Sequence, residues 1–331
     1  MDGDPAMNLT TPYLGLNLIT PFVVGASPLC DDLETARRLQ DAGASALVMR
    51  SLFAEQVINS RDPFPGVEQG QEETSDYHDF AAYQLSPDEY LRQIERLKKT
   101  VSIPIIASLN GHRAGSWTTL APRLEAAGAN AIELNFYQVV TDPAIQADAV
   151  EMEMIELVRT IVSSVAIPVS AKLSPYHSSI SQLAVAFELV GAAGVVVFNR
   201  FYHPDIDVDA LSVQPVIRLS DPGELLLRLR WLAILSPLLR CSLGVTGGVH
   251  TWSGVAKSIL AGAHAVQLVS VLLKHGPPVI ATLRDGLEMW MREHGFTDLE
   301  QFRGALNQQR CANPAAFERA NYVRALQSWR I

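Results

Sequence analysis

Short apolar segments alternate with helix-like segments along almost the whole chain. The short segments are rich in β-branched residues, and they are separated by stretches with helical periodicity. Eight such segments can be counted: Phe22–Ala26, Ala46–Met49, Ile103–Ser108, Ala131–Asn135, Pro168–Lys172, Gly194–Asn199, Ser242–Thr246 and Ala265–Val269. A chain that repeats strand and helix in this way forms a parallel sheet covered by helices.

Glycine marks the joints between the predicted helices and the following strands. Such glycines suit the left-handed cap that ends a helix. They occur in Asp41-Ala-Gly-Ala, Ala127-Gly-Ala-Asn, Ala193-Gly and Ala261-Gly-Ala-His. A doubly wound open sheet is the competing architecture. The eight units and a late glycine-rich turn favour a closed TIM (β/α)8 barrel with loop insertions on its C-terminal face.

The late glycine-rich turn lies in the segment Gly244–Ser253. Gly247 and Gly248 allow backbone N–H groups to approach an anion, and a helix that begins near Ser253 adds its positive end. Phosphate sites of such barrels lie after strands seven and eight. We therefore expect a phosphorylated ligand here.

Composition limits the class of protein and its partners. The 331 residues are 48% hydrophobic, enough for one large domain that spans residues 1–331. The net charge of -9 argues against nucleic acid and against an anionic membrane surface. No run of 18 apolar residues occurs, and the acidic N-terminus is no signal peptide. We expect a cytoplasmic protein with small-molecule partners.

The cysteines do not form a disulfide framework or a metal site. Cys30, Cys241 and Cys311 are few and scattered, and no Cys-x-x-Cys pair occurs. Asp205, Asp207 and Asp209 alternate, but no pattern of metal ligands surrounds them. We expect reduced thiols, no metal, and aspartates that are solvated or paired with Arg200.

Three segments extend beyond a minimal barrel. Residues 55–83 form a long polar loop after the second strand, which is either a lid or a disordered insertion. Residues 200–222 follow the sixth strand and contain a predicted hairpin around Leu211–Leu219. Residues 300–331 form a C-terminal extension with a predicted helix over Ala315–Trp329, and another apolar helix is predicted over Leu225–Leu239.

Polar side chains stand at the ends of apolar strands. Lys172, Asn135 and Asn199 are examples. Buried polar groups cost free energy unless they are paired, and the chemistry of these barrels lies at the carboxyl ends of the strands. We expect these groups to converge on a ligand.

The polar positions also have a characteristic order. They are Ala26-Ser27, Arg50-Ser51, Glu133-Leu-Asn135, Ala171-Lys-Leu-Ser-Pro175, Asn199, Thr246-Gly-Gly248 and Ser270. In this order the chain resembles the class 1 dihydroorotate dehydrogenases, FMN-dependent barrel enzymes of pyrimidine biosynthesis. It is most similar to the branch of dihydroorotate dehydrogenase-like proteins, over about residues 8–325.

The resemblance implies FMN as cofactor and a role for each position. Asn135, Lys172 and Asn199 would contact the flavin ring or the substrate as catalytic residues. A lysine there stabilises negative charge as a hydride reaches the ring. The remaining cofactor-binding residues would be Ala26, Ser27, Arg50, Ser51, Thr246, Gly247, Gly248 and Ser270.

The chain departs from the family where a proton is removed from the substrate. The family carries a catalytic cysteine, and this sequence has Gln138 there, whose amide cannot act as a base. Tyr137 is the first candidate for that role, with Tyr176, His177 and His112 on neighbouring loops. Two further departures are Arg50 in place of a lysine, and the loop after the second strand, which lacks the family's substrate segment.

The resemblance implies an oxidoreductase acting on a CH-CH group, which converts dihydroorotate to orotate with fumarate as acceptor. Three alternatives remain open: the same flavin chemistry on another substrate, a catalytically silent flavoprotein subunit, and an aldolase or phosphate-binding isomerase that uses Lys172 as a Schiff base. The class 1 relatives form dimers, which suggests a homodimer. His250, which follows the phosphate turn, is expected to be a surface or capping residue.

Overall fold

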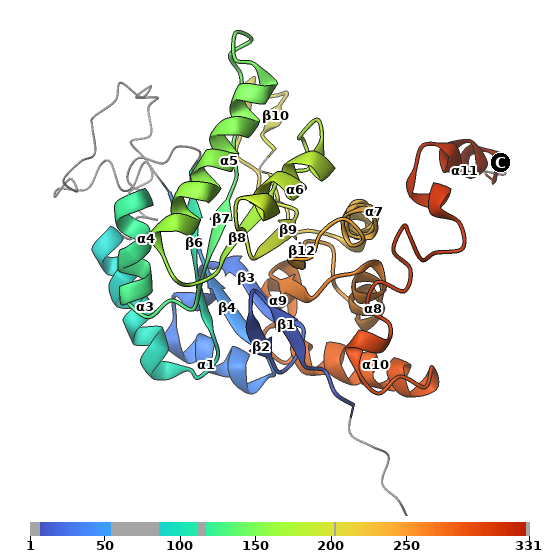
Figure 1. The fold of residues 1–331 in the computed structure, drawn as a ribbon. Helices are drawn as coiled ribbons and strands as arrows, with labels where there is room; N and C mark the ends of the chain where they lie inside the picture. The colour runs from blue at the N-terminus through green and yellow to red at the C-terminus, as the bar shows by residue number, and fades with distance from the viewer. Residues whose placement is uncertain (1–6, 54–85, 112–116, 202, 329–331) are drawn as a thin grey trace, which may run out of the picture.

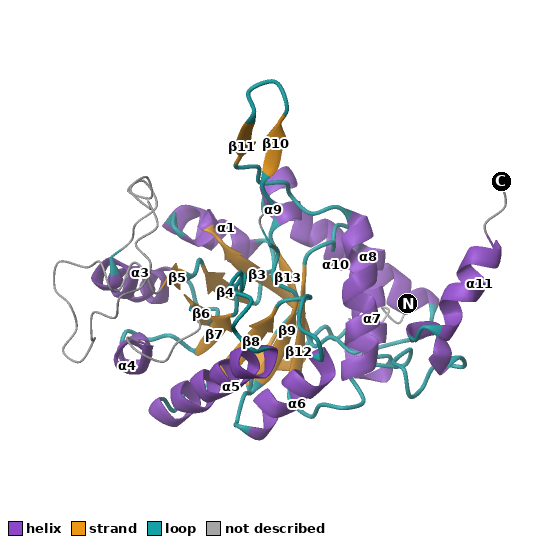
Figure 2. Ribbon diagram, turned by 90° about the horizontal axis from the view of Figure 1, so that it is seen from above, coloured by secondary structure: helices purple, strands orange, loops and turns teal. Residues whose placement is uncertain are grey.

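Eight parallel strands close into a barrel in the computed structural model, which describes residues 7–53, 86–111, 117–201 and 203–328 (Figures 1 and 2). Around the barrel the strands are β3 (Phe22–Ser27), β4 (Ala46–Met49), β6 (Ile105–Asn110), β7 (Ala131–Asn135), β8 (Val169–Leu173), β9 (Gly194–Val197), β12 (Ser242–Thr246) and β13 (Ala265–Leu268). The pairings of β4 with β6 and of β13 with β3 close the ring. The short strand β5 (Leu52–Phe53) pairs with the end of β6. The predicted TIM barrel is confirmed.

Helices cover the outside of the barrel and bury their apolar faces against the strands. They are α1 (Leu33–Asp41), α3 (Pro87–Thr100), α4 (Trp117–Ala126), α5 (Ala147–Ser164), α6 (Ile180–Leu189), α7 (Leu225–Leu235), α8 (Trp252–Ala261), α9 (Ser270–His275) and α10 (Val279–Glu293). Ser86 and Glu89 form a reciprocal capping box at the start of α3. Within the described residues, no helix is long and apolar enough to cross a membrane.

The predicted glycine joints are confirmed at three positions and wrong at one. Gly43, Gly128 and Gly262 have positive φ between a helix and the next strand. Between α6 and β9 the residue with positive φ is Gly191, whereas Gly194 is the first residue of the strand. The joint after α6 therefore lies three residues before the predicted Gly194, because Gly191 adopts the left-handed conformation. Gly194 is a glycine for a different reason.

That reason is a hairpin that closes the amino end of the barrel, formed by β1 (Thr11–Tyr13) and β2 (Leu16–Leu18). A Cβ atom on Gly194 would lie next to Leu14, and one on Gly244 would lie 2.8 Å from the Tyr13 hydroxyl. Tyr13, Leu14 and Leu18 pack there against inward-facing residues of the strands. The inside of the barrel is therefore apolar and filled at this end, and the opposite end remains for chemistry.

The segments beyond the minimal barrel differ from expectation in detail. The hairpin after β9 pairs β10 (Asp205–Asp207) with β11 (Ser212–Gln214), so its turn lies earlier than the predicted Leu211–Leu219 hairpin. Asp207 accepts hydrogen bonds from two backbone amides of this turn, which explains the shift. The loop at 55–83 lies outside the described residues.

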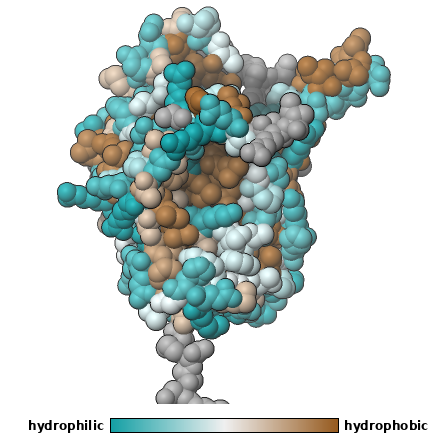
Figure 3. All heavy atoms as spheres, turned by 90° about the vertical axis from the view of Figure 1, so that its right-hand side faces the viewer, coloured by the Kyte–Doolittle hydropathy of each residue, from teal (hydrophilic) through white to brown (hydrophobic). Residues whose placement is uncertain are grey.

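The predicted helices near the C-terminus are also shorter. The apolar helix ends at Leu235 rather than Leu239. The extension is broken into the 3-10 turns Leu299–Gln301 and Pro314–Phe317 and the helix α11 (Ala320–Ser328). Figure 1 shows α11 standing away from the barrel. On the face that carries α7 and α11, apolar side chains gather in a hollow (Figure 3), and α7 there exposes Leu226 by 71%.

Replacement of Gly244 by alanine is expected to lower the free energy of unfolding by about 1–3 kcal/mol, because the new methyl group collides with the Tyr13 hydroxyl. The double variant Gly244→Ala/Tyr13→Phe should recover most of this loss, since phenylalanine lacks the colliding oxygen. Urea unfolding of both variants and of Tyr13→Phe alone measures the effect. Equal destabilisation of the single and double variants would contradict the packing of the hairpin under β12.

Candidate active site at the carboxyl end of the barrel

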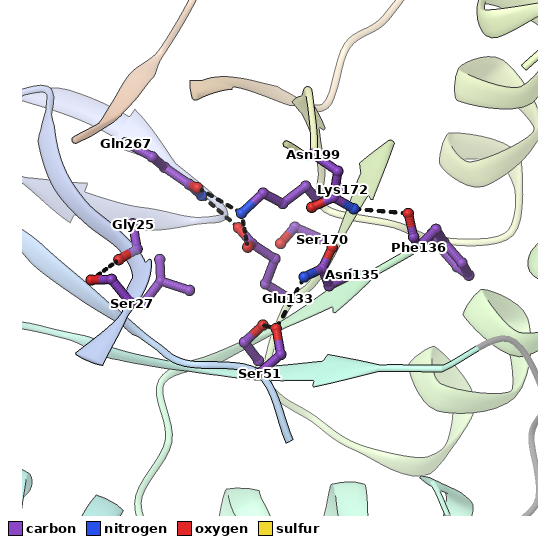
Figure 4. Close-up of polar contacts among 12 residues, drawn as sticks. Gly25, Ser27, Ser51, Glu133, Asn135, Phe136, Ser170, Lys172, Asn199 and Gln267 are labelled. Atoms are coloured by element: carbon purple, nitrogen blue, oxygen red, sulfur yellow. Dashed lines mark hydrogen bonds and ion pairs between the residues drawn. The ribbon is translucent and has the colours of Figure 1, made fainter. Parts of the chain in front are cut away.

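A buried ion pair stands at the centre of the site. Lys172 on β8 places its Nζ 2.9 Å from Glu133 Oε1 on β7, and both side chains are at least nine-tenths buried. Lys172 also donates to Gln267 Oε1 on β13 at 3.3 Å, and Gln267 donates its Nε2 to Glu133 Oε2. Three strands thus contribute one closed polar triad (Figure 4).

A second polar group lies beside the triad. Asn135 is two residues beyond Glu133 on β7, and it therefore points to the same side of the sheet. Its Nδ2 donates to Ser51 Oγ at 3.0 Å, and Ser51 Oγ lies 2.8 Å from Ser108 Oγ. Asn135 Oδ1 is buried and has no hydrogen-bond partner among the described residues. A buried acceptor without a donor is the state that a ligand or a water would satisfy.

The remaining predicted ring contacts lie on neighbouring strand ends. The Ser27 hydroxyl donates to Gly25 O, which leaves the hydroxyl occupied by its own backbone, and Ala26 next to it is half-buried. Arg50 pairs with Asp31 at 3.4 Å. Asn199 donates Nδ2 to Phe136 O at 2.8 Å, so it joins the ends of β7 and β9 (Figure 4).

The glycine turn lies across the mouth from Asn135, at the ends of β12 and β13. Gly247 and Gly248 both have positive φ, which favours glycine. A Cβ atom on Gly248 would lie 2.4 Å from Leu225 N, so the absence of a side chain also permits the close approach of the segment before α7. The helix that follows the turn, α8, begins at Trp252 and is capped by Thr251.

Hydroxyl and cationic groups that the sequence did not single out gather at this turn. Ser220 Oγ accepts from Gly248 N at 3.3 Å, and Ser220 N donates to the hydroxyl of the predicted residue Ser270. Lys274 Nζ donates to Ser220 O at 3.0 Å. His250 Nε2 lies 3.2 Å from Ser220 Oγ, which makes this histidine part of the cluster rather than a capping residue.

The titratable side chains around the glycine turn differ in their burial and in their ion-pair partners. Burial, and then Lys274, hold the pKa of His250 below its ordinary value, so the imidazole is neutral at pH 7. Arg228 is buried, donates to Thr246 O at 2.9 Å and pairs with Glu224. Glu224 also pairs with Arg200 at 3.4 Å. Of the two expectations for Asp205, Asp207 and Asp209, solvation agrees with the exposure of Asp205 and Asp209, and Asp205 pairs with Arg218 rather than with Arg200.

Aromatic side chains line the mouth next to the hairpin. Tyr137 stacks on Phe201 with ring centroids 4.3 Å apart, and Tyr176 meets the edge of Phe201 at 5.1 Å. Gln138 Oε1 and His177 Nε2 are buried without a hydrogen-bond partner among the described residues. Burial lowers the pKa of His177, so its ring is a neutral imidazole. His112, another candidate base, lies outside the described residues.

Two of the cysteines, Cys30 and Cys241, are held as protonated thiols. Burial, reinforced by Asp31, raises the pKa of Cys30 to about 12, and burial beside Glu188 raises that of Cys241 to about 12. Cys30 instead donates to Val48 O. These thiols stay protonated at pH 7 and are inert as bases.

Curated relatives with the same organisation cover most of this chain. It is 29% identical over 315 residues to the dihydroorotate dehydrogenase B (NAD(+)) catalytic subunit of Thermoplasma volcanium, covering 90% of this chain and 98% of the relative. It is 26% identical over 333 residues to the chloroplastic dihydropyrimidine dehydrogenase (NADP(+)) of Arabidopsis thaliana, covering 92% and 77%. It is 24% identical over 318 residues to the NAD-dependent dihydropyrimidine dehydrogenase subunit PreA of Escherichia coli, covering 91% and 77%.

The chain is related to the dihydroorotate and dihydropyrimidine dehydrogenases. The resemblance noted in the sequence is thereby confirmed. No family model matches the chain. The matches to these dehydrogenases cover 90–92% of the chain.

The sequence resemblance implies FMN as the ligand of this turn, and on that expectation the replacement of Gly248 by alanine weakens FMN binding by about tenfold or more, a loss of about 1.4 kcal/mol. The alanine is strained at φ +82, and its Cβ pushes the segment around Leu225 and Ser220 away from the turn. Titration of FMN fluorescence measures the affinity. Gly295→Ala is the matched control, since Gly295 also has positive φ but has nothing within 4 Å. Equal affinity of both variants would contradict the role of the turn.

Proposed function

We propose that this chain is an FMN-dependent oxidoreductase that acts on a carbon–carbon bond of a dihydropyrimidine ring, with dihydroorotate as the first candidate substrate. The observation that carries the proposal is the buried ammonium of Lys172 beside the unpartnered acceptor Asn135 Oδ1, at the carboxyl end of the barrel. The relationship to dihydroorotate and dihydropyrimidine dehydrogenases supports the choice of ring.

The residues present fit FMN at both of its ends. At the phosphate end, the Gly247-Gly248 turn, the hydroxyls of Ser220 and Ser270 and the Lys274 ammonium lie within one hydrogen-bonded cluster. At the ring end, Lys172 offers a donor, and Asn135 Oδ1 is an acceptor in need of one. A flat heterocycle that carries both donors and acceptors satisfies such a pair.

FMN, when bound, supplies a hydride acceptor. The protein's part is to fix charge and exclude water. The Lys172 ammonium, held in a site from which water is excluded, stabilises negative charge that develops on a ring at the mouth. Asn199 links the end of β9 to Phe136 after β7, and Asn135 links the end of β7 to Ser51 after β4, so both fix the strand ends that face a bound ring. The rim around the proposed ring site consists of Thr246, Ala26, Ser27, Arg50 and Ser51.

The proton acceptor must be a group other than cysteine. Among the candidates, His177 has a neutral imidazole and a buried Nε2 without a partner, the properties of a base ready to accept a proton. Tyr137 is half-buried and stacked on Phe201. We propose His177 ahead of Tyr137, because an imidazole accepts a proton near neutral pH and a phenol must first lose one.

The Schiff-base alternative is disfavoured by the same geometry. An amine attacks a carbonyl only when it is unprotonated, whereas Lys172 is ion-paired with Glu133 and donates to Gln267. The alternative of a catalytically silent flavoprotein subunit remains; two relatives are named as subunits, one of them as a catalytic subunit, which supports a place in a larger redox complex but not silence. In that case electrons would leave to a partner, whereas a free-standing enzyme would use an acceptor such as fumarate.

The proposal also includes the metabolic role, the cellular location and the oligomeric state of the protein. We place the reaction in pyrimidine metabolism in the cytoplasm. A homodimer is supported by the exposed apolar residues of the β10–β11 hairpin, since large exposed apolar patches mark interaction surfaces. These are Ile206, Val208, Leu211 and Val213. A single domain over residues 1–331 agrees with the continuous core that the barrel and its helices share.

Anaerobic addition of dihydroorotate to the FMN-saturated protein is expected to bleach the visible flavin band, because the electrons of the substrate reduce the ring. Lys172→Met should slow this bleaching by about a hundredfold, the scale of losing one electrostatic contact to developing charge. Stopped-flow absorbance measures the rate, and dihydrouracil and dihydrothymine serve as comparison substrates. Bound flavin that no dihydropyrimidine bleaches would refute the substrate class, and absence of bound flavin would refute the proposal.

The pH dependence of the reaction is expected to identify the base. A base works only when unprotonated, so with His177 the ratio kcat/KM is lost as pH falls through the lowered pKa of His177, below about 6.5. His177→Gln should abolish this acid limb and lower the rate by about 10²–10⁴-fold. An acid limb that His177→Gln leaves unchanged, together with a loss of rate in Tyr137→Phe, would assign the base to Tyr137.

A further inference from the structure

The ammonium of Lys172 is held by two acceptors from two other strands. A lysine carries three N–H donors. One reaches Glu133 Oε1 at 2.9 Å and another reaches Gln267 Oε1 at 3.3 Å. Among the described residues the third donor has no acceptor, although Lys172 is only 6% exposed. The two contacts therefore leave one donor for a ligand.

Gln267 has only one orientation that fits this arrangement. Its Oε1 accepts from Lys172 Nζ and its Nε2 donates to Glu133 Oε2. The opposite orientation would set an NH₂ group against an ammonium and an oxygen against a carboxylate. The amide thus connects the two charged groups and fixes the position of both, and it adds no charge of its own.

A glycine on the neighbouring strand β3 leaves room for the side chain of Gln267. Gly25 on β3 faces Gln267, and a Cβ atom on Gly25 would lie 3.3 Å from Gln267 Cβ and 2.7 Å from a Val269 methyl group. Below the triad, the Tyr13 hydroxyl is buried beside Glu133 and Gln267. The triad therefore lies between the apolar base of the barrel and its open mouth.

We propose that Glu133 and Gln267 are positioning residues that aim the free donor of Lys172 at the bound ring, and that the carboxylate of Glu133 sets how strongly the ammonium attracts electrons to it. This inference rests on the proposed function for the identity of the ring. Its geometric part, the hold on Lys172, stands without it.

The charges around Lys172 determine in which direction each substitution should change the reduction of the ring and the loss of the lysine proton. Glu133 is the carboxylate in contact with the ammonium, and among the described residues Tyr13 is a further titratable group beside the triad. Burial raises the pKa of Tyr13, so it stays neutral over the range tested. Removal of the carboxylate charge leaves the ammonium uncompensated, which favours a reduced, more negative ring. The same change makes the amine lose its proton more easily.

The first arm of the test is the reduction potential of bound FMN. Glu133→Gln is expected to shift the equilibrium at least tenfold toward reduced flavin, about 30 mV for a two-electron couple. Gln267→Glu adds a second carboxylate and should shift it in the opposite direction. Ser170→Ala is the matched control, because Ser170 is buried on the same strand as Lys172 but bonds to Ile132 O instead. A shift in the control equal to that of Glu133→Gln would overturn the proposal.

The second arm needs no flavin. Reductive methylation of the apoprotein, followed by mass spectrometry, reports how readily each lysine loses its proton, with the exposed Lys257 as internal reference. At neutral pH, Glu133→Gln should increase the labelling of Lys172 relative to Lys257 at least tenfold, and Gln267→Glu should decrease it. Thermal unfolding checks that each variant is folded. If Glu133→Gln does not fold, the reduction potential and the labelling of Gln267→Glu test the proposal.

The two arms separate the possible failures. A wild-type protein that binds no FMN refutes the proposed function, while the labelling arm still tests the hold on Lys172. Unchanged labelling and unchanged potential in both variants would overturn the positioning role. Changed labelling with an unchanged potential would overturn the proposed influence on the ring.

Discussion

The ion pair between Lys172 and Glu133 is the constraint on which the rest of the site depends. Two charges removed from water cost several kcal/mol each, so the pair persists only with good geometry and further hydrogen bonds. Gln267 supplies those bonds from the far side of the barrel. Neighbouring strands β7 and β8 bring the two charged groups together, and closure of the barrel brings the third.

The amino end of the barrel is apolar, whereas its carboxyl end is polar. The β1–β2 hairpin fills the amino end with Tyr13, Leu14 and Leu18, which keeps water from reaching the triad from below. Polar groups are concentrated at the carboxyl end, where the ion pair and the glycine turn lie on different sides of one mouth. A ligand that reaches both has an anionic end and a polar ring, which is the chemistry of a flavin mononucleotide.

The described groups near the mouth that could accept a proton include no ionised thiol. Gln138 Oε1 is buried there without a partner among the described residues. The described thiols Cys30 and Cys241 are held protonated by burial. Close to Gln138, the stacked rings of Tyr137 and Phe201 narrow the mouth, and His177 provides an unprotonated nitrogen. Of these groups, Tyr137 and His177 are the candidates for proton transfer in the proposed reaction.

The sequence by itself predicted the barrel, because eight apolar segments with helical spacers and a late glycine-rich turn favour closure over a doubly wound open sheet. Three of the predicted strands end where the structure ends them. The sequence also predicted Lys172, Asn135 and the glycine turn, since polar residues and glycines stand out in apolar segments. Only the tertiary structure decided the partners. Gln267 is 95 residues from Lys172, and Ser220 is 50 from Ser270, so no local pattern links them. The roles of Tyr13, Gly194 and Gly244 likewise follow from a hairpin that packs against distant strands, because contacts between remote segments arise from closure of the barrel and leave no periodic signal in the sequence.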